Sequence, residues 1–310
     1  MRLERREFLE AAVAGTAGAL MAGRWAVAQP ATAAPADMDP TAVVPLGKAL
    51  KVCRISCGTG MRGGGRQTNQ TRMGKEKFEA LLNYAYDHGI RHFDMADMYG
   101  THPYVGRVLK SKPRENLTLV TKIWTRRGGL PEPERPLADV LLKRFLKELQ
   151  TDYIDVVQIH CMTDSDWTRS ERRQMDALEK LKEQGLIRAH GVSIHSIPAM
   201  EAAVEEPWVD VIHARVNPFG RSTDGPMEKV VPLLKKAHAA GKGIIGMKLI
   251  GEGAFDLPQR KQALEFVMGL GCIDALTVGF EKAEEIDEFK ANVHERLLAR
   301  ARRSETVPVS

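Results

Sequence analysis

Residues 77–96 read KFEALLNYAYDHGIRHFDMA and join a helical pattern to a strand pattern. The first part predicts an amphipathic helix over 77–89, because its apolar side chains recur at the helical spacing. These side chains are Phe78, Leu81, Leu82 and Ala85. Gly89 follows where a helix C-terminus favours glycine, and the short run RHFDMA (91–96) then predicts a strand. The stretch is one helix–strand repeat of an α/β protein.

The same alternation continues along the chain. From residue 50 onward, short apolar runs alternate with amphipathic stretches about eight times. The expected strands are 51–56, 91–96, 117–123, 153–159, 186–193, 209–216, 243–249 and 273–278. Eight repeats in about 250 residues favour a single parallel (β/α)8 barrel, the TIM barrel. An open doubly wound sheet uses the same βαβ units and stays an alternative, since periodicity does not separate the two.

The composition excludes several classes of protein. Of the 310 residues, 43% are hydrophobic and 27% are charged, which excludes disordered and collagen-like chains. The net charge of +5 and the 6% aromatic content are too low for a basic, aromatic nucleic-acid surface, so no nucleic-acid partner is expected. Four cysteines are too few for a disulfide scaffold, and no Cys or His pair has metal-ligand spacing, so no metal is expected.

The N-terminus has the pattern of a targeting segment. An arginine pair at residues 5–6 precedes Phe8 and Leu9, an Ala- and Gly-rich stretch follows, and residues 26–28 (Ala-Val-Ala) offer a cleavage site. Residues 1–28 therefore resemble a twin-arginine export signal. An amphipathic N-terminal helix or a retained anchor is the alternative. The apolar stretch is too short and too Gly-rich for stable membrane insertion.

This interpretation divides the chain into four parts. Residues 1–28 are the signal, 29–47 a flexible leader, 48–298 the barrel and 299–310 a basic C-terminal tail. The expected location is the periplasm or another exported compartment, with the twin-arginine translocase as a partner during export. Without a true signal the protein would be cytoplasmic.

Four chemically active side chains follow successive expected strands. Asp94 and Tyr99 follow the second strand, Lys122 the third and His160 the fourth, and a barrel brings such positions together at its carboxyl-terminal mouth. We expect Asp94 to hold Lys122, whose ammonium lowers the pKa of Tyr99, while His160 orients a carbonyl oxygen. Taken singly, each residue has an ordinary structural explanation, such as a helix cap or a hydrogen bond within the core.

Three segments carry a resemblance to a known family. HFDMADMYGTHPYVGRVL (92–109), LVTKIW (119–124) and DYIDVVQIH (152–160) resemble the signature, lysine strand and histidine strand of the aldo-keto reductases. The resemblance covers roughly residues 48–295. It implies a barrel enzyme that transfers hydride between NADP(H), or NAD(H), and the carbonyl or alcohol of a small molecule such as an aldehyde, ketone or sugar. It makes Tyr99 the proton donor.

The same resemblance implies a set of cofactor-binding residues. They are Gly58, Thr59, Asp94, Ser193, His213, Lys248, Leu249, Gly251, Gly253, Gly279 and Glu288. Among them, Gly251 and Gly253 form a glycine-rich turn suited to a pyrophosphate.

The chain departs from the family pattern on this side. Ile194 stands where the family usually has Asn after Ser193, and His213 stands where Gln is common. Val216 stands where many members have a Tyr whose ring stacks on the nicotinamide. Gly279 and Glu285 stand where NADP-selective members place Lys and Arg.

Two other functions are compatible with these residues. The barrel could bind a nucleotide as a sensor or interaction module without turnover, which the changes at Ile194 and Val216 favour. Alternatively, a lyase or isomerase could use Tyr99 and Lys122 as acid and base with no net hydride transfer. Between the first strand and helix, the Gly-rich segment MRGGGRQTNQTRMGK (61–75) is interpreted as a solvated loop in preference to a mobile flap.

Overall fold

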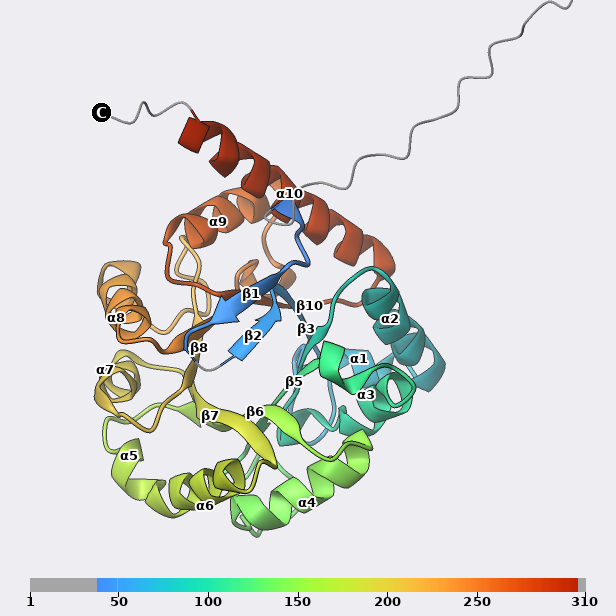
Figure 1. The fold of residues 1–310 in the computed structure, drawn as a ribbon, viewed down its shortest axis with the longest axis vertical. Coiled ribbons are helices and arrows are strands. Elements are labelled where there is room, and N and C mark those ends of the chain that lie inside the picture. The colour runs from blue at the N-terminus through green and yellow to red at the C-terminus, as the bar shows by residue number, and fades with distance from the viewer. Residues whose placement is uncertain (1–37, 49, 306–310) are drawn as a thin grey trace, which may run out of the picture. The chain divides into compact units, whose positions relative to one another are not determined.

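A computed structural model describes residues 38–48 and 50–305 of the protein, and the expected signal segment lies outside this range. Eight parallel strands close into a barrel in the order β10-β3-β4-β5-β6-β7-β8-β9, with helices around the outside (Figure 1). The (β/α)8 prediction is therefore confirmed, and the doubly wound sheet is excluded. The barrel strands are β3 (Ile55–Gly58), β4 (His92–Asp94), β5 (Thr118–Ile123), β6 (Ile154–Met162), β7 (Ile187–Ile194), β8 (Val211–Arg215), β9 (Gly243–Met247) and β10 (Ala275–Gly279).

The helices form the outer layer. They are α1 (Asn69–Arg72), α2 (Lys75–Asp87), α3 (His102–Leu109), α4 (Ala138–Leu149), α5 (Trp167–Ser170), α6 (Arg172–Glu183), α7 (Ile197–Glu205), α8 (Met227–Ala239), α9 (Leu257–Gly269) and α10 (Ala283–Glu305), with 3-10 turns η2 (Asp97–Tyr99), η3 (Arg114–Asn116) and η4 (Gly251–Gly253). Helix α2 buries the four apolar side chains expected of it, and Gly89 adopts a left-handed φ of 95° just beyond its end. The helical periodicity there is confirmed.

The first expected strand is wrong in one respect. Residues 51–56 are divided between β2 (Leu50–Cys53), which pairs antiparallel with β1 (Val43–Leu46), and the barrel strand β3. The chain changes partner at Arg54, whose amide donates to the Ala42 carbonyl at 2.9 Å while its own carbonyl accepts from the Leu276 amide at 2.8 Å. Strand β1 also lies inside the segment 29–47, which was expected to be a flexible leader.

The hairpin has a clear physical reason to be ordered. Leu46 and Val52 are buried against apolar side chains from six barrel strands. These side chains are Val120, Val156, Ala189, Val211, Ile245 and Ala275. Burying apolar surface is worth about 25 cal/mol per Å², so a hairpin that covers the open end of the barrel is held by this contact. Figure 1 looks onto this face, with β1 and β2 in front of the barrel.

The alternation of side chains along the strands separates two environments. On β4, Phe93 joins the cluster between barrel and helices, whereas its neighbours His92 and Asp94 are buried polar residues. Val120 and Val156 belong to the inner apolar layer, and the residues two positions further, Lys122 and Gln158, are register partners. The inside of the barrel is therefore apolar at the hairpin end and polar toward the carboxyl ends of the strands.

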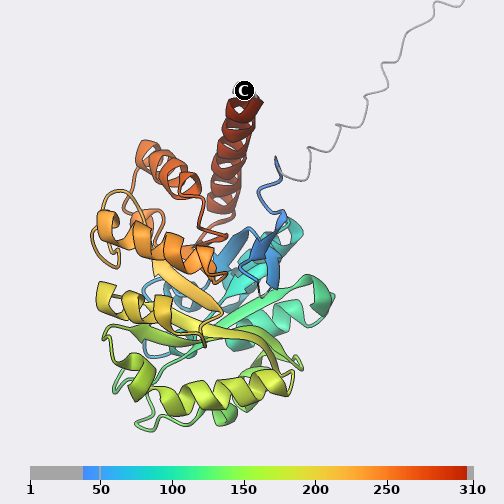
Figure 2. The ribbon, with the colours of Figure 1, turned by 60° about the vertical axis from the view of Figure 1, so that its left-hand side comes forward.

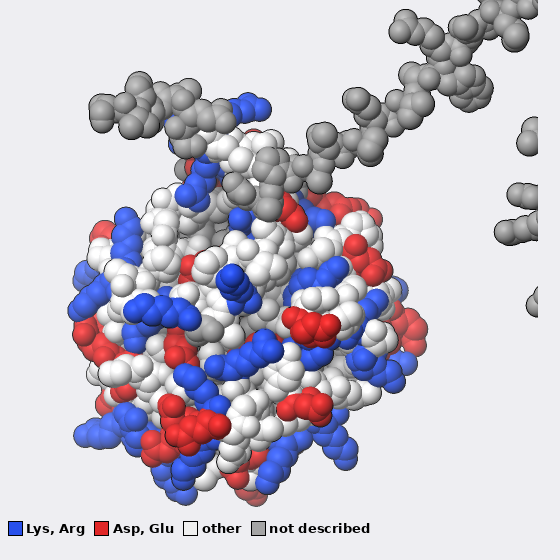
Figure 3. Space-filling view, viewed as in Figure 1, with Lys and Arg blue, Asp and Glu red and all other residues white. Residues whose placement is uncertain are grey.

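The last helix is longer than expected. Helix α10 runs to Glu305, so residues 299–305 of the expected basic tail continue the helix, which projects beyond the barrel (Figure 2). In the described part of the chain, no helix is long and apolar enough to cross a membrane. On the face drawn in Figure 3, Lys and Arg are interspersed with Asp and Glu.

Candidate active site

A buried ion pair lies at the carboxyl ends of β4 and β5. Lys122 Nζ donates to Asp94 Oδ1, and also to the Met95 carbonyl at 3.0 Å. Lys122 is 1% exposed and Asp94 5%. Burial lowers the pKa of Lys122 and raises that of Asp94, while each charge opposes the shift of the other. The expected contact between these two residues is present.

Tyr99 lies above this pair, on the short turn η2 that follows β4. Its ring centre is 5.7 Å from Lys122 Nζ and 5.6 Å from the ring of His160, which it meets edge-on. Burial raises the pKa of Tyr99, and the Asp94 carboxylate raises it further. The net shift of this pKa is therefore upward, and the lowering expected from Lys122 stays a prediction. The phenol therefore stays protonated near neutral pH.

The glycine-rich loop after β3 is packed on the Tyr99 ring. A Cβ atom on Gly60 would lie 2.3 Å from Tyr99 Cζ, and one on Gly63 would lie 2.8 Å from Cδ1. The loop is also tied by the Arg66 amide, which donates to the Met98 carbonyl at 2.8 Å. The interpretation of 61–75 as a solvated loop is wrong at Gly63, which forms a wall of the site together with the preceding Gly60. Glycine is required here because the aromatic ring leaves no room for a side chain.

His160 is positioned by a bulge in β6. The register with β7 shifts between Ile159 and Met162, and Cys161 has a left-handed φ of 69°. The Cys161 amide donates to Ser193 Oγ at 2.8 Å, so Ser193 supports the bulge.

The environment of His160 keeps its imidazole neutral. His160 is 6% exposed, and its ring lies edge-on to the Trp124 ring, with centres 5.5 Å apart. Burial, followed by the charge of Lys122, holds the pKa of His160 well below its ordinary value. His160 Nδ1 is buried and has no hydrogen-bond partner among the described residues. A neutral imidazole with unused hydrogen-bonding capacity thus lies beside the Tyr99 ring.

A polar layer below the site supports it. His213 Nδ1 lies 2.7 Å from Gln158 Oε1, and Nε2 lies 3.4 Å from Thr277 Oγ1 and 3.7 Å from Asp94 Oδ1. Both ring nitrogens therefore already have neighbours, and a role of His213 toward a nicotinamide stays a prediction. The sequence reasoning missed Gln158, although its position two residues before His160 on the same strand places it on the same face.

Gly58 and Thr59 support Asp94. Thr59 donates to the Asp94 carbonyl from its amide at 3.0 Å and from its hydroxyl at 2.9 Å. Its hydroxyl also lies 2.8 Å from that of Thr101. Gly58 is the register partner of both Asp94 and Gly279, so the three meet at one edge of the barrel mouth.

The turn after β9 holds the next group of expected cofactor residues. Gly251, Glu252 and Gly253 all have left-handed φ values, and Leu249 is fully buried. A Cβ atom on Gly251 would meet the Phe255 ring at 2.5 Å, whereas Gly253 faces open space. The turn therefore has accessible backbone at Gly253, as close approach of a phosphate requires.

Lys248 in this turn is already paired. Its Nζ donates to Glu252, which also accepts from the Ser222 hydroxyl at 2.7 Å. Although burial raises the pKa of Glu252, these two contacts hold it below its ordinary value. Glu252 is thus a carboxylate at the position expected to bind a pyrophosphate, and no motif in the sequence indicated it.

The residues expected near the adenosine of the cofactor form contacts with other residues of the protein. Glu285 accepts hydrogen bonds from the amides of Glu281, at 2.7 Å, and Lys282, at 3.3 Å, and so caps the start of α10. Glu288 forms two hydrogen bonds with Arg260 of α9, at 2.8 and 3.1 Å. A Cβ atom on Gly279 would meet Met61 Cγ at 2.4 Å, so the loop after β3 reaches this edge as well.

The described residues offer groups for the pyrophosphate and the carboxamide of a nicotinamide nucleotide, but no ring to stack on the nicotinamide. The exposed backbone at Gly253 suits a pyrophosphate, whereas Lys248 beside it is held by Glu252. The Ser193 hydroxyl accepts one bond and keeps its proton to donate to a carboxamide. Ile194 and Val216 are fully buried in the core and present neither an amide nor a ring. The site suits the nucleotide without the stacking ring that the family pattern implies.

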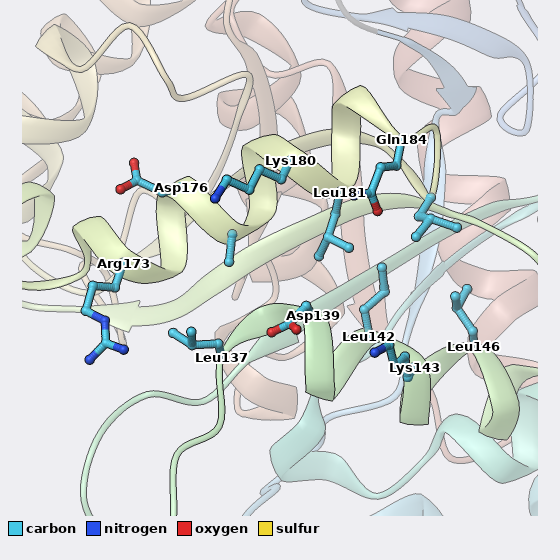
Figure 4. A pocket seen from close by; sticks show the side chains of 12 residues that line it. Leu137, Asp139, Leu142, Lys143, Leu146, Arg173, Asp176, Lys180, Leu181 and Gln184 are labelled. Atoms are coloured by element: carbon cyan, nitrogen blue, oxygen red, sulfur yellow. The ribbon is translucent and has the colours of Figure 1, made fainter.

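A hollow on the outside of the barrel is separate from these residues. It has a volume of about 490 Å³ and lies between α4 and α6 (Figure 4). Its lining includes Leu142, Leu146 and Lys180 and none of the four candidate catalytic residues. Within the described ranges, no group of three or more His, Cys, Asp or Glu is arranged to hold a metal ion.

The fold and the site together define a class: a (β/α)8 barrel with an aspartate, tyrosine, lysine and histidine gathered at its carboxyl-terminal mouth. The chain belongs to the aldo/keto reductase family, whose sequence profile matches residues 54–266. Methylglyoxal reductase DkgB of Salmonella typhi is 36% identical over 164 residues, or 51% of this chain and 57% of that protein. The chain spans about half the length of the first curated relatives it matches, at 57% and 48%.

Solved structures agree with this assignment. A Pseudomonas aeruginosa protein described as an aldo-keto reductase superposes with a TM-score of 0.66 at 25% identity, covering 82% of this chain and 95% of that one. An aldo/keto reductase of Klebsiella pneumoniae in complex with NADP and acetate superposes with a TM-score of 0.61 at 19% identity, covering 86% and 96%. At 19% identity, the comparison with the Klebsiella protein supports the fold alone.

Proposed function

We propose that the protein is an NAD(P)H-dependent reductase of small-molecule carbonyl compounds. The observation that carries the proposal is the contact of the Tyr99 and His160 rings beside the buried pair of Lys122 and Asp94. Burial there raises the pKa of Tyr99 and lowers that of His160, so the phenol is a proton donor and the imidazole is neutral. Membership of the aldo/keto reductase family and the similarity to a methylglyoxal reductase support it.

The side chains have distinct tasks in the reduction. His160 donates a hydrogen bond that orients the carbonyl oxygen, and Tyr99 gives its phenolic proton to the same oxygen. Lys122, held by Asp94, stabilises the phenolate that Tyr99 becomes. When bound, the reduced nicotinamide supplies hydride to the carbonyl carbon, so hydride and proton together convert the carbonyl to an alcohol. The wall made by Gly60 and Gly63 keeps the Tyr99 ring in place.

We take NADP(H) as the first candidate cofactor, with NAD(H) as the alternative. Ser193 would hold the carboxamide, and Lys248 with Gly251 and Gly253 the pyrophosphate. The NADP complex of the Klebsiella protein supports the first choice. The carboxylate of Glu285 at the start of α10 disfavours a 2′-phosphate and keeps NAD(H) open.

The test is turnover and binding measured on the same protein. We expect purified protein to bind NADPH or NADH and to oxidise it in the presence of methylglyoxal. Tyr99→Phe should lower kcat about 100-fold or more, because it removes the general acid, and should leave nucleotide binding unchanged. Tyr84→Phe is the control, since Tyr84 is on α2 and bonds Asp287 of α10.

Other outcomes would favour the alternatives. Nucleotide binding without turnover of any carbonyl would favour a sensor, the function that the buried Ile194 and Val216 support. Turnover without consumption of nicotinamide would favour a lyase or isomerase. Absence of binding at millimolar NADPH and NADH would exclude the reductase.

We also propose that residues 1–28 are a twin-arginine signal and that the protein acts in the periplasm. The arginine pair at 5–6, the apolar stretch and the Ala-Val-Ala sequence at 26–28 support this. Because this pathway carries folded proteins, the nucleotide would bind before export. Changing both arginines to lysine should keep the protein in the cytoplasm, as measured by cell fractionation. Unchanged location would contradict the signal.

A further inference from the structure

The loop between β5 and α4 is ordered by one arginine. The Arg135 guanidinium donates to four backbone carbonyls, at distances of 2.6 to 2.7 Å. These carbonyls belong to Arg126, Gly128, Glu132 and Glu134. Trp124 Nε1 also donates to the Gly128 carbonyl at 2.7 Å. The loop that begins at the end of β5 is therefore a defined structure beside the barrel mouth.

This loop places Arg126 against Cys161, the residue that follows the histidine of the site. Arg126 Nη1 donates to the Cys161 carbonyl at 3.3 Å and lies 3.8 Å from its sulfur. Its guanidinium carbon is 6.0 Å from the centre of the Trp124 ring, which in turn meets His160 edge-on. Arg126 is exposed to solvent. A cation thus contacts Cys161, the residue that follows His160 in the chain, and lies near the Trp124 ring that meets His160.

Arg126 differs from the other cations around this mouth. Lys122 is paired with Asp94, Lys248 with Glu252, and Arg215 with Asp224 at 2.6 Å. Within the described residues, Arg126 forms no ion pair. Burial, and then the charges of Arg215, Lys248, Lys122 and Arg126, lower the pKa of His195 to about 3, which shows that these cations act on one region.

A second observation points to a ligand at this place. His160 Nδ1 is buried without a partner among the described residues, and so is His195 Nδ1. Buried polar atoms normally have a partner, so these two nitrogens indicate groups that a substrate would satisfy. A substrate with a carbonyl oxygen and an anionic group would offer a hydrogen-bond acceptor to His160 and a counter-ion to Arg126.

We propose that Arg126 binds a carboxylate of the substrate, so that the enzyme prefers short oxo acids and aldehyde acids to neutral carbonyl compounds of the same size. The inference rests on the proposed reductase function and names its substrate class. The carboxylate pairs with the guanidinium near Trp124 and Cys161 while the carbonyl oxygen reaches His160 and Tyr99. Arg126 therefore selects the substrate by binding its carboxylate and takes no part in proton transfer.

The test compares 4-oxobutanoate with its methyl ester, which has the same carbonyl and no charge. We expect the wild-type protein to show a kcat/KM at least about tenfold higher for the acid, because a charged hydrogen bond adds to binding. Arg126→Gln should raise KM for the acid about tenfold and leave both constants for the ester within twofold. Arg126→Lys should recover part of the preference. Arg127→Gln, which changes the neighbouring exposed arginine, is the matched control and should have no effect.

The outcomes separate this inference from the function beneath it. If the enzyme converts both compounds to alcohols with equal kcat/KM, the reductase function stands and the role of Arg126 is overturned. An equal loss on both substrates in Arg126→Gln would also overturn it, because the side chain would then act on the loop. No reduction of either compound, or of methylglyoxal, by protein that binds NADPH would overturn the reductase and this inference with it.

Discussion

The charged side chains on the two sides of the barrel mouth find their partners in different environments. At the ends of β4 to β6, charges and rings contact one another inside the barrel: Asp94 holds Lys122, and Tyr99 meets His160. After β9 and β10, the carboxylates of Glu252 and Glu285 are held by nearby donors at the surface. The first side is prepared for proton transfer. The second side has its own anions where a nucleotide's phosphates are expected.

This difference shows how burial changes the cost of a substitution. Removing one partner of the Asp94–Lys122 pair leaves a charge without water or counter-ion, whereas Glu252 and Glu285 remain in contact with solvent. We therefore expect changes on the catalytic side to affect both stability and rate. Changes on the nucleotide side should mainly alter binding.

The largest effect is expected for Lys122→Met. It leaves the Asp94 carboxylate buried and unpaired, which should lower the free energy of unfolding by about 3–5 kcal/mol and abolish turnover. Combining it with Asp94→Asn removes both charges and should restore much of the stability but none of the activity. Urea unfolding and a carbonyl reduction assay measure the two effects. A loss below about 1 kcal/mol in Lys122→Met would mean that the pair is accessible to solvent.

The next effect is a loss of stability in acid from histidines whose pKa is lowered by burial. Burial lowers the pKa of His92 to about 4 and that of His195 to about 3. A histidine whose folded pKa is depressed contributes stability above its unfolded pKa, near 6.5, and loses it as the pH falls toward the folded value. For the fully buried His92 the loss should reach about 3 kcal/mol by pH 4.

Urea unfolding at pH 7, 5.5 and 4 measures this loss. His92→Gln cannot titrate and should unfold with a shallower dependence on pH, whatever its stability at pH 7. The exposed His88 on the outside gives the control His88→Gln, which should keep the wild-type slope. The same slope in all three proteins would contradict the assignment to His92.

A smaller effect is expected for Glu252→Gln on the nucleotide side. The change removes a carboxylate from the turn after β9 and frees Lys248, so NADPH should bind more tightly by about 1 kcal/mol, roughly fivefold in Kd. Fluorescence titration measures it. Glu265→Gln, on α9 and paired with Arg296, should leave Kd unchanged. Weaker binding in Glu252→Gln would show that Glu252 positions the turn for the nucleotide.

The smallest effect is expected for Glu285→Gln. The amide oxygen can still accept from the Glu281 and Lys282 amides, so the cap at the start of α10 should persist. Removal of the charge should raise the affinity for NADPH relative to NADH by about two- to threefold. The ratio of the two Kd values tests this. An unchanged ratio would place the 2′-phosphate away from Glu285.

Much of the fold was predictable, because strands inside a barrel are short apolar runs between amphipathic helices. The break at Arg54 was not, since residues 51–56 have one continuous strand pattern and only the contacts of Leu46 and Val52 with the barrel interior divide them. Similarly, the four candidate catalytic residues were visible as chemically active types after successive strands. The contact of Gly60 and Gly63 with the Tyr99 ring was not predictable, because no sequence pattern shows which ring a glycine lies against.

Periodicity and residue type are local properties, so the sequence alone predicted the strand–helix alternation and the strand ends that carry Asp94, Tyr99, Lys122 and His160. Eight repeats favoured the barrel, and the strand pairing in the structure excluded the open sheet. The upward shift of the Tyr99 pKa follows from the tertiary structure, since burial and the Asp94 carboxylate cause it. The tertiary structure also sets which charges are paired. Glu252 and Arg126 look alike in the sequence as charged loop residues, and only their neighbours in space make one a partner of Lys248 and leave the other for a ligand.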